Sequence, residues 1–381
     1  MLNKLFIAYL LLISISYCYN VSQEEEITKV AQLNKVKNLI LDTFIGKNNT
    51  KELFKVWHTI FKKDYDYNTE IGIDKYKKFK QNLIEIKQNN QKYSWKSGLN
   101  HHSDKTWEEV EKYYHIRTYT KEEINSYIGI DSPKSFNLDD YEDNDQENIQ
   151  TNNLKTKSPS HTPTGVNIDY RDLLTNPRDQ ENCGSCWAFT AADAVSGSYF
   201  VLQTKQNKSY DKYNLSVQQL IDCSNNYGCN GGFAGTAFGY YKRKSDPIRQ
   251  RDYPYEVADG TCRADQFEKT PIKVLGYNYA DTYNNIFLYL KQGLLGTCIF
   301  ANRNLFYYSS GIYDEKCKEN CNHAVVIVGW GTENNTPYWI IRNSWSINWG
   351  EDGYGRIKDD EENASSCMVS FARWIVAPTV S

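Results

Sequence analysis

The heptapeptide CGSCWAF, residues 183–189, places two cysteines three positions apart and follows them with a tryptophan. A C-x-x-C pair can be a redox couple, half of a zinc site, or one disulfide partner beside one reactive thiol. A redox couple predicts a thioredoxin-like βαβ pattern around the pair, and a zinc site requires two more ligands at matching spacing. The flanking sequence offers neither, which favours the reactive thiol.

The chain has 381 residues, enough for two or three domains, and its formal net charge of −3 argues against nucleic acid or an anionic membrane as partner. At the N-terminus, Lys4 precedes an apolar run at 5–13, and Ser16 and Cys18 are small enough for a cleavage site. This pattern predicts a secretory signal over residues 1–18, with a buried N-terminal helix as the alternative. We expect no membrane span and an acidic lysosome-like or extracellular destination.

Secretory entry changes how the ten cysteines are read. If Cys18 leaves with the signal, nine remain, and an odd count in an oxidising compartment implies cystines plus at least one free thiol. Six N-x-S/T triplets give weak support to this route and predict glycosylation sites at Asn20, Asn48, Asn207, Asn214, Asn334 and Asn363.

Three further segments follow the signal. Residues 24–130 are charged and helix-patterned, with one apolar stripe in KELFKVWHTIFKK. Residues 131–165 are polar, with six acids in the nine residues DDYEDNDQE, and predict a flexible linker that contains the activation cleavage region. Residues 166–381 are rich in Gly, Cys and aromatics and form the predicted catalytic domain. The apolar stripe consists of Leu53, Phe54, Trp57, Ile60 and Phe61.

Within the last segment, helix signals precede strand signals. CWAFTAADAVSGSYFVL predicts a helix that begins near Cys186, and its small residues allow close packing. NLSVQQLIDC predicts a second helix, with Ser216 and Gln219 as a capping box and Leu215 and Leu220 as a hydrophobic staple. TCIFA, HAVVIVGWG and YWIIRNSW have strand composition. This order predicts an α+β protein with a cleft between two halves.

A nucleophilic Cys186 needs activation, because an ordinary thiol is mostly protonated at neutral or acidic pH. A helix that begins at Cys186 would direct its positive N-terminal end at the sulfur, and His323, the sole histidine after Cys186, could hold the pair as thiolate and imidazolium. Asn343 could orient the imidazole, and Trp345 could shield that bond from water. The Gln180 amide could join the Cys186 N–H in an oxyanion hole.

The motifs QENCGSCWAF, DCSNNYGCNGG, NHAVVIVGWG and RNSWSINWGEDGYG resemble the papain-like cysteine proteases. The gap of 137 residues between Cys186 and His323 fits that group. The upstream segment resembles cathepsin L-type inhibitory propeptides at Lys75, Phe79, Asn82, Ile86 and Asn90, and then at Gly98, Asn100 and Asp104. The resemblance implies a two-lobed fold, with a helical lobe and a β-barrel-like lobe, preceded by a helical prosegment that inhibits the enzyme.

The resemblance also implies roles for individual residues. Cys186 is then the nucleophile, His323 the acid/base, Asn343 the orienting residue and Gln180 the oxyanion donor. The implied substrate contacts are Gly231, Gly232, Phe233, Ala234, Ala324, Ala372 and Trp345. The implied disulfides are Cys183–Cys229, Cys223–Cys262 and Cys317–Cys367. For Cys298 and Cys321 three outcomes stay open: they pair, they are free, or Cys321 replaces Cys317.

The chain departs from the family pattern at several positions. In the catalytic domain, Glu181 stands where glycine is usual, Asn322 replaces aspartate and Ser346 replaces glycine. In the prosegment, Ile71 replaces glutamate and His102 replaces phenylalanine, while Lys75 stands for arginine. None of these changes removes an atom that the chemistry requires.

Together the motifs predict a cysteine endopeptidase that needs no cofactor or metal. After GCNGGF no long histidine-bearing insertion follows, which disfavours an exopeptidase. The specificity pocket, with either Phe300 or Ala301 at one position, predicts an apolar residue two places before the cut. The expected partners are protein and peptide substrates, the chain's own propeptide and cystatin-type inhibitors, around a monomeric enzyme. The alternative is a binding or inhibitory protein that kept the fold and lost turnover.

Overall fold

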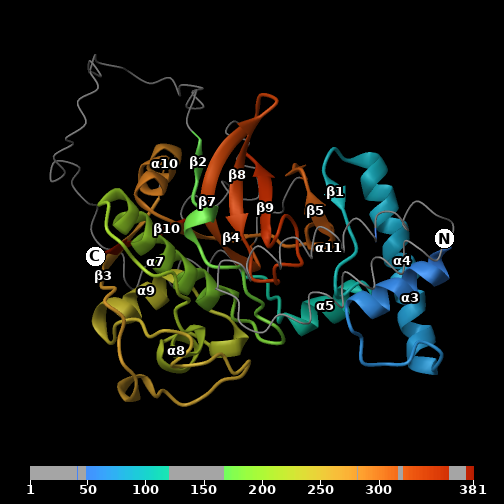
Figure 1. The fold of residues 1–381 in the computed structure, drawn as a ribbon, viewed down its shortest axis with the longest axis horizontal. Helices are drawn as coiled ribbons and strands as arrows, with labels where there is room; N and C mark the ends of the chain where they lie inside the picture. The colour runs from blue at the N-terminus through green and yellow to red at the C-terminus, as the bar shows by residue number, and fades with distance from the viewer. Residues whose placement is uncertain (1–40, 42–48, 120–166, 281, 316–320, 360–374) are drawn as a thin grey trace. The chain divides into compact units, whose positions relative to one another are not determined.

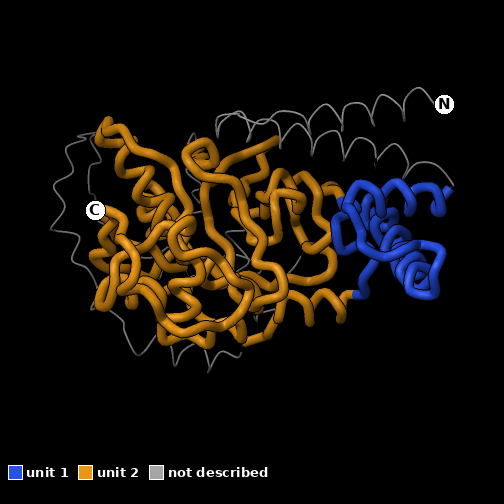
Figure 2. Tube along the Cα trace, turned by 60° about the horizontal axis from the view of Figure 1, so that its bottom comes forward, with its two compact units in different colours: residues 1–93, 97–106 blue, residues 94–96, 107–381 orange. Residues whose placement is uncertain are grey.

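The structure is a computed structural model of the chain and describes residues 41, 49–119, 167–280, 282–315, 321–359 and 375–381 (Figure 1). The predicted signal segment and acidic linker lie outside the described residues. The chain forms two compact units: a first unit of residues 1–93 and 97–106, and a second unit of residues 94–96 and 107–381 (Figure 2).

The first unit is built on the helices α3 (Thr50–Ile60) and α4 (Glu70–Lys92). Each begins at a side-chain cap, because Asn49 accepts a hydrogen bond from Glu52 N and Thr69 accepts one from Gly72 N. The predicted stripe is confirmed at its centre: Leu53, Phe54 and Trp57 are buried, and the ring of Trp57 lies 5.1 Å from that of Phe79 on α4. Aromatic contacts therefore hold the helix pair together.

The segment 97–106 is attached to α4 by the asparagines of the prosegment pattern. The Asn82 amide, which is buried, donates to the carbonyls of Ser103 and Lys105 at 2.9 and 2.8 Å. Asn90 pairs with the backbone of Ser97 through both amide atoms, as acceptor at 2.7 Å and donor at 3.0 Å. Spaced asparagines on one helix thus satisfy the backbone groups of a segment that is mostly loop.

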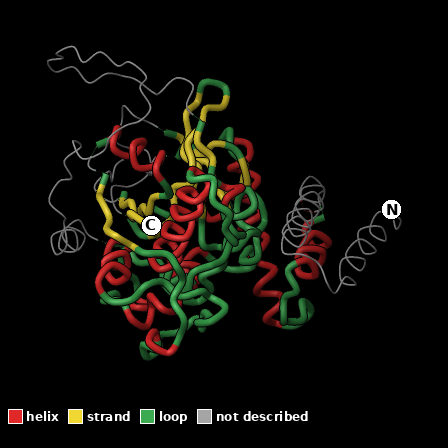
Figure 3. The backbone as a smooth tube through the Cα atoms, turned by 60° about the vertical axis from the view of Figure 1, so that its left-hand side comes forward, coloured by secondary structure: helices red, strands yellow, loops and turns green. Residues whose placement is uncertain are grey.

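The second unit holds the remaining elements, and loops and turns connect its helices and strands (Figure 3). Strand β1 (Lys96–Ser97) marks the passage between the units. The helices are α5 (Trp107–Tyr113), α7 (Cys186–Lys205), α8 (Val217–Cys223), α9 (Ala234–Arg243), α10 (Tyr283–Gln292) and α11 (Arg303–Phe306), with short 3₁₀ turns at Arg171–Leu173, Gly228–Asn230 and Ala264–Gln266. The strands are β2 (Ile168–Asp169), β3 (Val274–Tyr279), β4 (Leu295–Ile299), β5 (Tyr308–Ser310), β6 (Ile312–Tyr313), β7 (His323–Glu333), β8 (Thr336–Arg342), β9 (Tyr354–Lys358) and β10 (Val376–Val380).

One sheet dominates the second unit, with the strand order β3-β10-β4-β7-β8-β9-β6 and β2 paired to β7. Its two ends, β3 and β6, are not paired with each other, so the described strands form an open sheet rather than a closed barrel. Helix α7 packs against β4, β7 and β10 (Figure 1). The α+β class expected from the sequence is confirmed, with the correction that the sheet is open.

Helix α7 is buried along most of its length, and its small residues are what allow this. At Gly197 an added Cβ would lie 2.3 Å from a methyl group of Leu294, so a side chain there would collide with the neighbouring segment. The helix begins at Cys186, as the sequence predicts. Its burial fixes the helix axis, and hence the position of its first residue, against the sheet.

Helix α8 begins as predicted but is capped differently. Ser216 Oγ accepts from Gln219 N at 3.0 Å, which is half of the predicted capping box. The other half is wrong, because Gln219 Oε1 accepts from Ile248 N at 2.9 Å, and Ser216 N donates to the carbonyl of Ile248. A loop far along the chain has therefore replaced the local bond. Leu215 and Leu220 are both buried in the core that includes α7.

The predicted strands TCIFA, HAVVIVGWG and YWIIRNSW correspond to β4, β7 and β8, although β8 ends at Arg342, just before Asn343. Strand β7 begins at His323 and pairs with β4 so that His323 lies opposite Ile299 and Ala324 opposite Cys298. In the described part of the chain, no helix is both long and apolar enough to cross a membrane.

Candidate active site

Cys186 lies at the first residue of α7 and is the free thiol among the described cysteines. Its neighbours at the helix start use their backbone groups locally: Gly184 N donates to Cys229 O at 2.8 Å, and Ser185 O accepts from Ala188 N and Phe189 N. The N–H groups of the first helical turn leave positive partial charge beside the sulfur. Burial raises the pKa of the Cys186 thiol, while backbone N–H groups of Ala324, Trp187 and Cys186 itself act to lower it.

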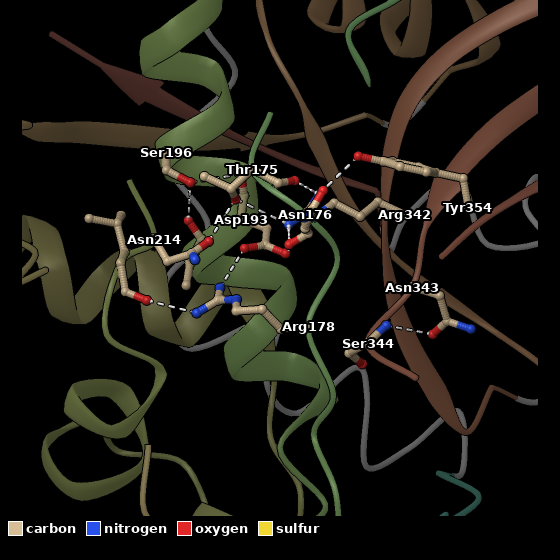
Figure 4. Close-up of polar contacts among 12 residues, drawn as sticks. Thr175, Asn176, Arg178, Asp193, Ser196, Asn214, Arg342, Asn343, Ser344 and Tyr354 are labelled. Carbon is tan, nitrogen blue, oxygen red and sulfur yellow. Dashed lines mark hydrogen bonds and ion pairs between the residues drawn. The ribbon is translucent and has the colours of Figure 1, made fainter. Parts of the chain in front are cut away.

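His323 and Asn343 are brought together across the β7–β8 pair. His323 Nε2 lies 2.7 Å from Asn343 Oδ1, and both side chains are buried. The same oxygen accepts from Ser344 N at 2.7 Å, so two donors converge on it and Nε2 carries the imidazole proton (Figure 4). Nδ1 of His323 is therefore the nitrogen left to exchange a proton with another group.

Trp345 covers this pair. Its ring stacks on the His323 imidazole, with centroids 4.3 Å apart and planes 19° from parallel. The indole is fully buried and also packs edge-on against Phe306 and Trp349. Because the indole excludes water, the hydrogen bond between His323 and Asn343 lies in a low-dielectric environment, where it is strengthened.

The Gln180 side chain is held by hydrogen bonds to Ser344, Cys183 and Tyr114. Its Oε1 accepts from Ser344 Oγ at 2.7 Å and its backbone N donates to Ser344 O at 2.9 Å. Its Nε2 donates to Cys183 O at 3.0 Å and more weakly, at 3.4 Å, to the carbonyl of Tyr114. The donor end of the amide is thus shared between the carbonyls of Cys183 and Tyr114.

In this form of the protein, burial disfavours the charged form of both the thiol and the imidazole. Burial lowers the pKa of His323 to about 4, although the hydrogen bond to Asn343 acts in the opposite direction. Burial likewise favours the protonated thiol of Cys186. Removing water from a thiolate or an imidazolium disfavours the charged form, which is the direction of both pKa shifts.

Tyr119, which was expected to belong to the prosegment, contributes to the cover over these two groups. Cys186 and His323 line one cavity of about 50 Å³ together with Tyr119. Tyr119 N donates to Cys321 O at 3.1 Å, and its hydroxyl accepts from Gly232 N at 3.2 Å. Its ring lies 5.1 Å from the ring of Phe233. Gly231 has a φ of +111°, and a Cβ there would lie 2.0 Å from the Tyr119 hydroxyl, so glycine is needed for this approach.

The cavity lining includes some of the residues expected to contact substrate. Gly232, Phe233, Ala234 and Ala324 line it. Gly231 and Trp345 are not among the described lining residues. Gly231 lies close to the Tyr119 hydroxyl, and Trp345 stacks on the His323 ring. Ala372 lies outside the described residues. The lining residues that the sequence analysis did not name are Gly235, Tyr279, Gly296, Thr297, Cys298 and Val376.

The described part of β4 contributes Thr297 and Cys298 to the cavity lining. Phe300 and Ala301, one of which the sequence analysis placed in the specificity pocket, are not among the described lining residues of this cavity, and their place in that pocket stays a prediction. The register fixes the position of Cys298, which lies opposite Ala324, with Thr297 opposite Val325. A sequence without the strand pairing contains no signal for this register, since the loop before His323 can have any length.

The disulfides isolate Cys186. Cys183 is bonded to Cys229 and Cys223 to Cys262, which are the pairings implied by the family resemblance. Cys298 is bonded to Cys321, one of the outcomes left open. Cys317 and Cys367 lie outside the described residues. The C-x-x-C motif is thus a cystine partner followed by a thiol.

The Asn322 side-chain amide makes a pair of hydrogen bonds that an aspartate could not make. Its Oδ1 accepts from Ala301 N at 2.6 Å and its Nδ2 donates to Ala301 O at 2.9 Å. A carboxylate can only accept, so this two-way bond needs an amide. With the Cys298–Cys321 disulfide one residue earlier, it fixes the backbone immediately before His323.

A buried ion cluster connects the segments that carry the site (Figure 4). Asp193, on α7, pairs with Arg178 Nη2 at 2.5 Å and with Arg342 Nε at 2.7 Å. Arg178 precedes Gln180 by two residues, and Arg342 precedes Asn343. Burial acts to raise the pKa of Asp193, but the two guanidiniums outweigh it and leave the pKa below its usual value. One carboxylate therefore connects three segments.

The described residues contain no group of three or more His, Cys, Asp or Glu side chains placed to hold a metal ion. What they do contain is a thiol at a helix start, an imidazole oriented by an amide, and an amide donor nearby. These are the parts needed for acyl transfer through a thioester.

Comparison with known proteins agrees with this chemistry. The family described as "Papain family cysteine protease" matches residues 163–374. Cysteine protease XCP2 of Arabidopsis thaliana is 31% identical over 81% of this chain and 80% of its own length. A cathepsin L-like peptidase of Aedes aegypti is 30% identical over 85% of this chain and 95% of its own.

Solved structures extend the likeness to precursors. A recombinant stem bromelain precursor has a TM-score of 0.69 at 27% identity, covering 87% of this chain and 99% of its own. Digestive procathepsin L 3 of Tenebrio molitor has a TM-score of 0.66 at 26% identity, covering 87% and 100%. The bromelain protease from Ananas comosus in complex with the E64 inhibitor has a TM-score of 0.51 at 32% identity, covering 56% and 98%.

Proposed function

We propose specific roles for the residues of this site on the premise that the chain belongs to the papain family of cysteine proteases. The protein is a cysteine endopeptidase made as a zymogen, as its precursor relatives are. Cys186 is the nucleophile, His323 the acid/base and Asn343 the residue that orients the imidazole. Gln180 Nε2 and the Cys186 N–H stabilise the oxyanion.

The reaction then has two halves. The Cys186 thiolate attacks a peptide carbonyl carbon, and negative charge develops on the oxygen near the Gln180 amide. The His323 imidazolium gives its Nδ1 proton to the leaving amine, which departs and leaves a thioester. Water attacks the thioester while His323 Nδ1 takes its proton, and the acid product leaves with the thiolate restored. Asn343 keeps Nδ1 turned toward the sulfur throughout.

The prosegment residues 114–119 inhibit this reaction by occupying its contacts. The Tyr114 carbonyl takes the Gln180 donor, and the Tyr119 hydroxyl takes Gly232 N, a backbone donor that an extended substrate would use. Their presence also keeps the Cys186–His323 pair dry and neutral. Release of this segment admits water and substrate, and the thiolate–imidazolium pair forms.

The observation that carries the proposal is that His323, which lies 2.7 Å from Asn343, lines the same cavity as the free thiol of Cys186. The test is alkylation of the processed enzyme by an epoxide inhibitor of the E64 type, with peptide hydrolysis measured in parallel. We expect the inhibitor to label Cys186 and the rate of peptide hydrolysis to fall in proportion to the labelled fraction. A processed protein that takes no label and cleaves no peptide is the binding protein instead.

The cavity also supports an uncharged, largely apolar residue two places before the cut. Phe233, Ala234, Ala324 and Val376 line it, and the described lining contains no Asp, Glu, Lys or Arg. A buried charge without a partner is costly, so charged side chains are disfavoured there. Fluorogenic peptides that vary at this position test the preference. If the peptide with arginine or glutamate two places before the cut is cleaved fastest, the preference for an uncharged residue is wrong.

The route and partners belong to the same proposal. The enzyme enters the secretory pathway, acts as a monomer in an acidic or extracellular compartment, and is bound by cystatin-type inhibitors. The acidic residues between 104 and 147 lose charge as pH falls, which weakens the prosegment. Purified precursor incubated at pH 7 and at about pH 4.5 tests this point, and equal processing rates contradict it.

A further inference from the structure

The stretch that carries the two proposed oxyanion donors has no regular structure of its own. Gln180 and Cys186 are six positions apart, and the residues between them belong to no helix or strand. The Cys183–Cys229 disulfide and the hydrogen bond from Gly184 N to Cys229 O fix the middle of this stretch. The distance between the two donors therefore depends on what holds the two ends of the stretch.

A single tyrosine hydroxyl contacts both ends. Tyr255 Oη donates to the Gln180 carbonyl at 2.6 Å and lies 2.8 Å from Ser185 Oγ. The one proton of the phenol is used on the Gln180 carbonyl, so the Ser185 hydroxyl is the donor in the second contact. Ser185 directly precedes Cys186. The Tyr255 hydroxyl thus connects the backbone of one donor residue to the residue next to the other.

Ser185 gives up its usual role to make this contact. It is the N-cap residue of α7, where a serine side chain normally accepts a hydrogen bond from a backbone N–H of the first turn. In the described structure the Ser185 hydroxyl makes no such cap. The side chain is fully buried and bonds instead to Tyr255, a residue 70 positions away. A stabilising local bond is therefore replaced by a contact that joins two loops.

The start of α8 holds the loop that carries Tyr255. Ser216 Oγ donates to Tyr253 O at 2.7 Å. Gln218 Oε1 accepts from Glu256 N at 2.9 Å. The backbone is therefore held two residues before Tyr255 and one residue after it.

The ring and the hydroxyl of Tyr255 are fixed as well. The ring packs edge-on against Phe189 of α7, with centroids 5.1 Å apart and planes 86° apart. Burial raises the pKa of the Tyr255 hydroxyl, which therefore keeps its proton at neutral and acidic pH. Tyr255 is not among the described residues that line the cavity, so it acts on the site through its two partners.

We propose that Tyr255 is a positioning residue of the oxyanion site, which sets the distance between the Gln180 amide and the Cys186 N–H. This inference rests on the proposed function and refines it. Donors stabilise an oxyanion best when they already point at the place where the charge develops. Ser344 O accepts from Gln180 N at 2.9 Å, and the Tyr255 hydroxyl holds the carbonyl of the same residue. Without that hydroxyl the Gln180 carbonyl loses this partner, and the two donors shift relative to each other.

Tyr255→Phe keeps the ring contact with Phe189 and removes the hydroxyl. We expect kcat to fall about threefold to thirtyfold with little change in KM, because both donors remain but are less well placed. The loss should be smaller than in Gln180→Ala, which removes a donor outright. Ser185→Ala should lose less still, because Tyr255 continues to donate to the Gln180 carbonyl.

The experiment uses the full chain, processed to its active form and titrated with an E64-type epoxide so that rates refer to competent enzyme. Each variant is tested for peptide hydrolysis, for inhibition by a peptide aldehyde and for alkylation of Cys186 by iodoacetamide. In the aldehyde complex the Cys186 sulfur bonds the carbonyl carbon and the thiol proton passes to the oxygen, which gives a tetrahedral hemithioacetal with its oxygen at the oxyanion site. Alkylation forms no such oxygen. In Tyr255→Phe we expect aldehyde affinity to fall by about the factor lost from kcat/KM, while alkylation keeps the wild-type rate.

Tyr170→Phe is the matched control. The Tyr170 hydroxyl also donates to backbone carbonyls of the second unit, those of Leu290 and Lys291 at 3.0 and 3.2 Å. The loss of a similar bond away from the site should leave all three measurements unchanged. When Ser185→Ala is added to Tyr255→Phe, the loss should equal that of Tyr255→Phe alone, because the two hydroxyls act through one contact.

The possible failures can be told apart. If Tyr255→Phe hydrolyses peptides like the wild type, if its hydrolysis and alkylation fall together, or if Tyr170→Phe loses as much, the inference is wrong and the proposed function stands. If Tyr255→Phe does not fold, wild-type hydrolysis and aldehyde affinity in Ser185→Ala overturn the inference in the same way. If the processed wild type takes no epoxide and cleaves no peptide, the proposed function itself fails.

Discussion

His323 Nε2 lies 2.7 Å from Asn343 Oδ1, beneath the ring of Trp345. His323 is the first residue of β7, the strand that pairs with β4. This single contact fixes which nitrogen of the imidazole is available for chemistry. It also joins two strand ends that are twenty residues apart in sequence.

Asn343→Ala should lower kcat/KM by about ten- to a hundredfold, because the imidazolium loses a hydrogen bond to its orienting partner. Most of the loss should be in kcat, since Asn343 does not line the cavity. Steady-state kinetics on epoxide-titrated enzyme measures it. Asn348→Ala, which removes a polar contact with Ser346 outside the cavity, is the control and should leave the rate unchanged. A fully active Asn343→Ala enzyme would contradict the orienting role.

Gln180→Ala should reduce kcat by about a hundred- to a thousandfold, because it removes one oxyanion donor. Alkylation of Cys186 by iodoacetamide should slow much less, since that reaction develops no oxyanion. Comparing the two rates separates the lost donor from a lost fold. The control is Gln206→Ala at the exposed end of α7. Equal losses in both reactions would speak against the assignment.

Tyr119→Phe should weaken inhibition within the precursor, because Gly232 N loses its acceptor while the ring contact with Phe233 remains. We expect epoxide labelling of Cys186 in the unprocessed precursor to accelerate about threefold to tenfold. Tyr119→Ala, which also removes the ring, should accelerate it further. Tyr67→Phe, in the first unit, is the matched control. An unchanged labelling rate in Tyr119→Ala would show that this residue does not hold the site closed.

The first unit should lose stability as pH falls. His102 is buried beside His101, with ring centroids 3.9 Å apart, and Lys63, Lys105 and Lys75 add positive charge around them. Burial lowers the pKa of His102, and that of His101 to about 3, from an ordinary 6.5. A folded-state pKa below the unfolded one contributes stability that is present above pH 6.5 and is lost as pH falls below it, because the unfolded chain takes up the proton first.

His102→Phe keeps an aromatic ring and removes the proton site. In a Cys186→Ser precursor, hydrogen exchange across residues 97–106 should rise between pH 7 and pH 5, and His102→Phe should reduce that rise. At pH 7 the two precursors should exchange alike. His115→Phe, at an exposed histidine of the second unit, is the control. The same pH dependence with and without His102 would exclude it as the acid-sensitive group.

Asp193→Asn should destabilise the second unit by about 3–5 kcal/mol, because it leaves two buried guanidiniums without their shared carboxylate. Chemical denaturation of the precursor measures the change. Asp169→Asn breaks an ion pair of similar geometry with Arg171 at the surface and should cost less than about 1 kcal/mol. Equal effects of the two substitutions would show that the buried cluster contributes no more than a surface pair.

The sequence by itself determined the elements that depend on local order. The helix that begins at Cys186, the strand that begins at His323, and the family motifs around Gln180 and Asn343 follow from residue patterns a few positions long. Small residues on α7 predicted its burial, because close approach requires them wherever the partner lies. The prosegment asparagines were likewise visible as a spaced pattern.

Only the tertiary structure decided the relationships set by pairing register and by distant partners. The β4–β7 register placed Cys298 opposite Ala324 in the cavity wall, and a shift of one residue would have reversed every side chain of the strand. The Gln219 side chain accepts a hydrogen bond from Ile248 N in a distant loop instead of completing the expected capping box. The bond between Cys298 and Cys321, and the hydroxyl of Tyr119 on Gly232 N, depend on chain folding that brings together residues up to 113 positions apart.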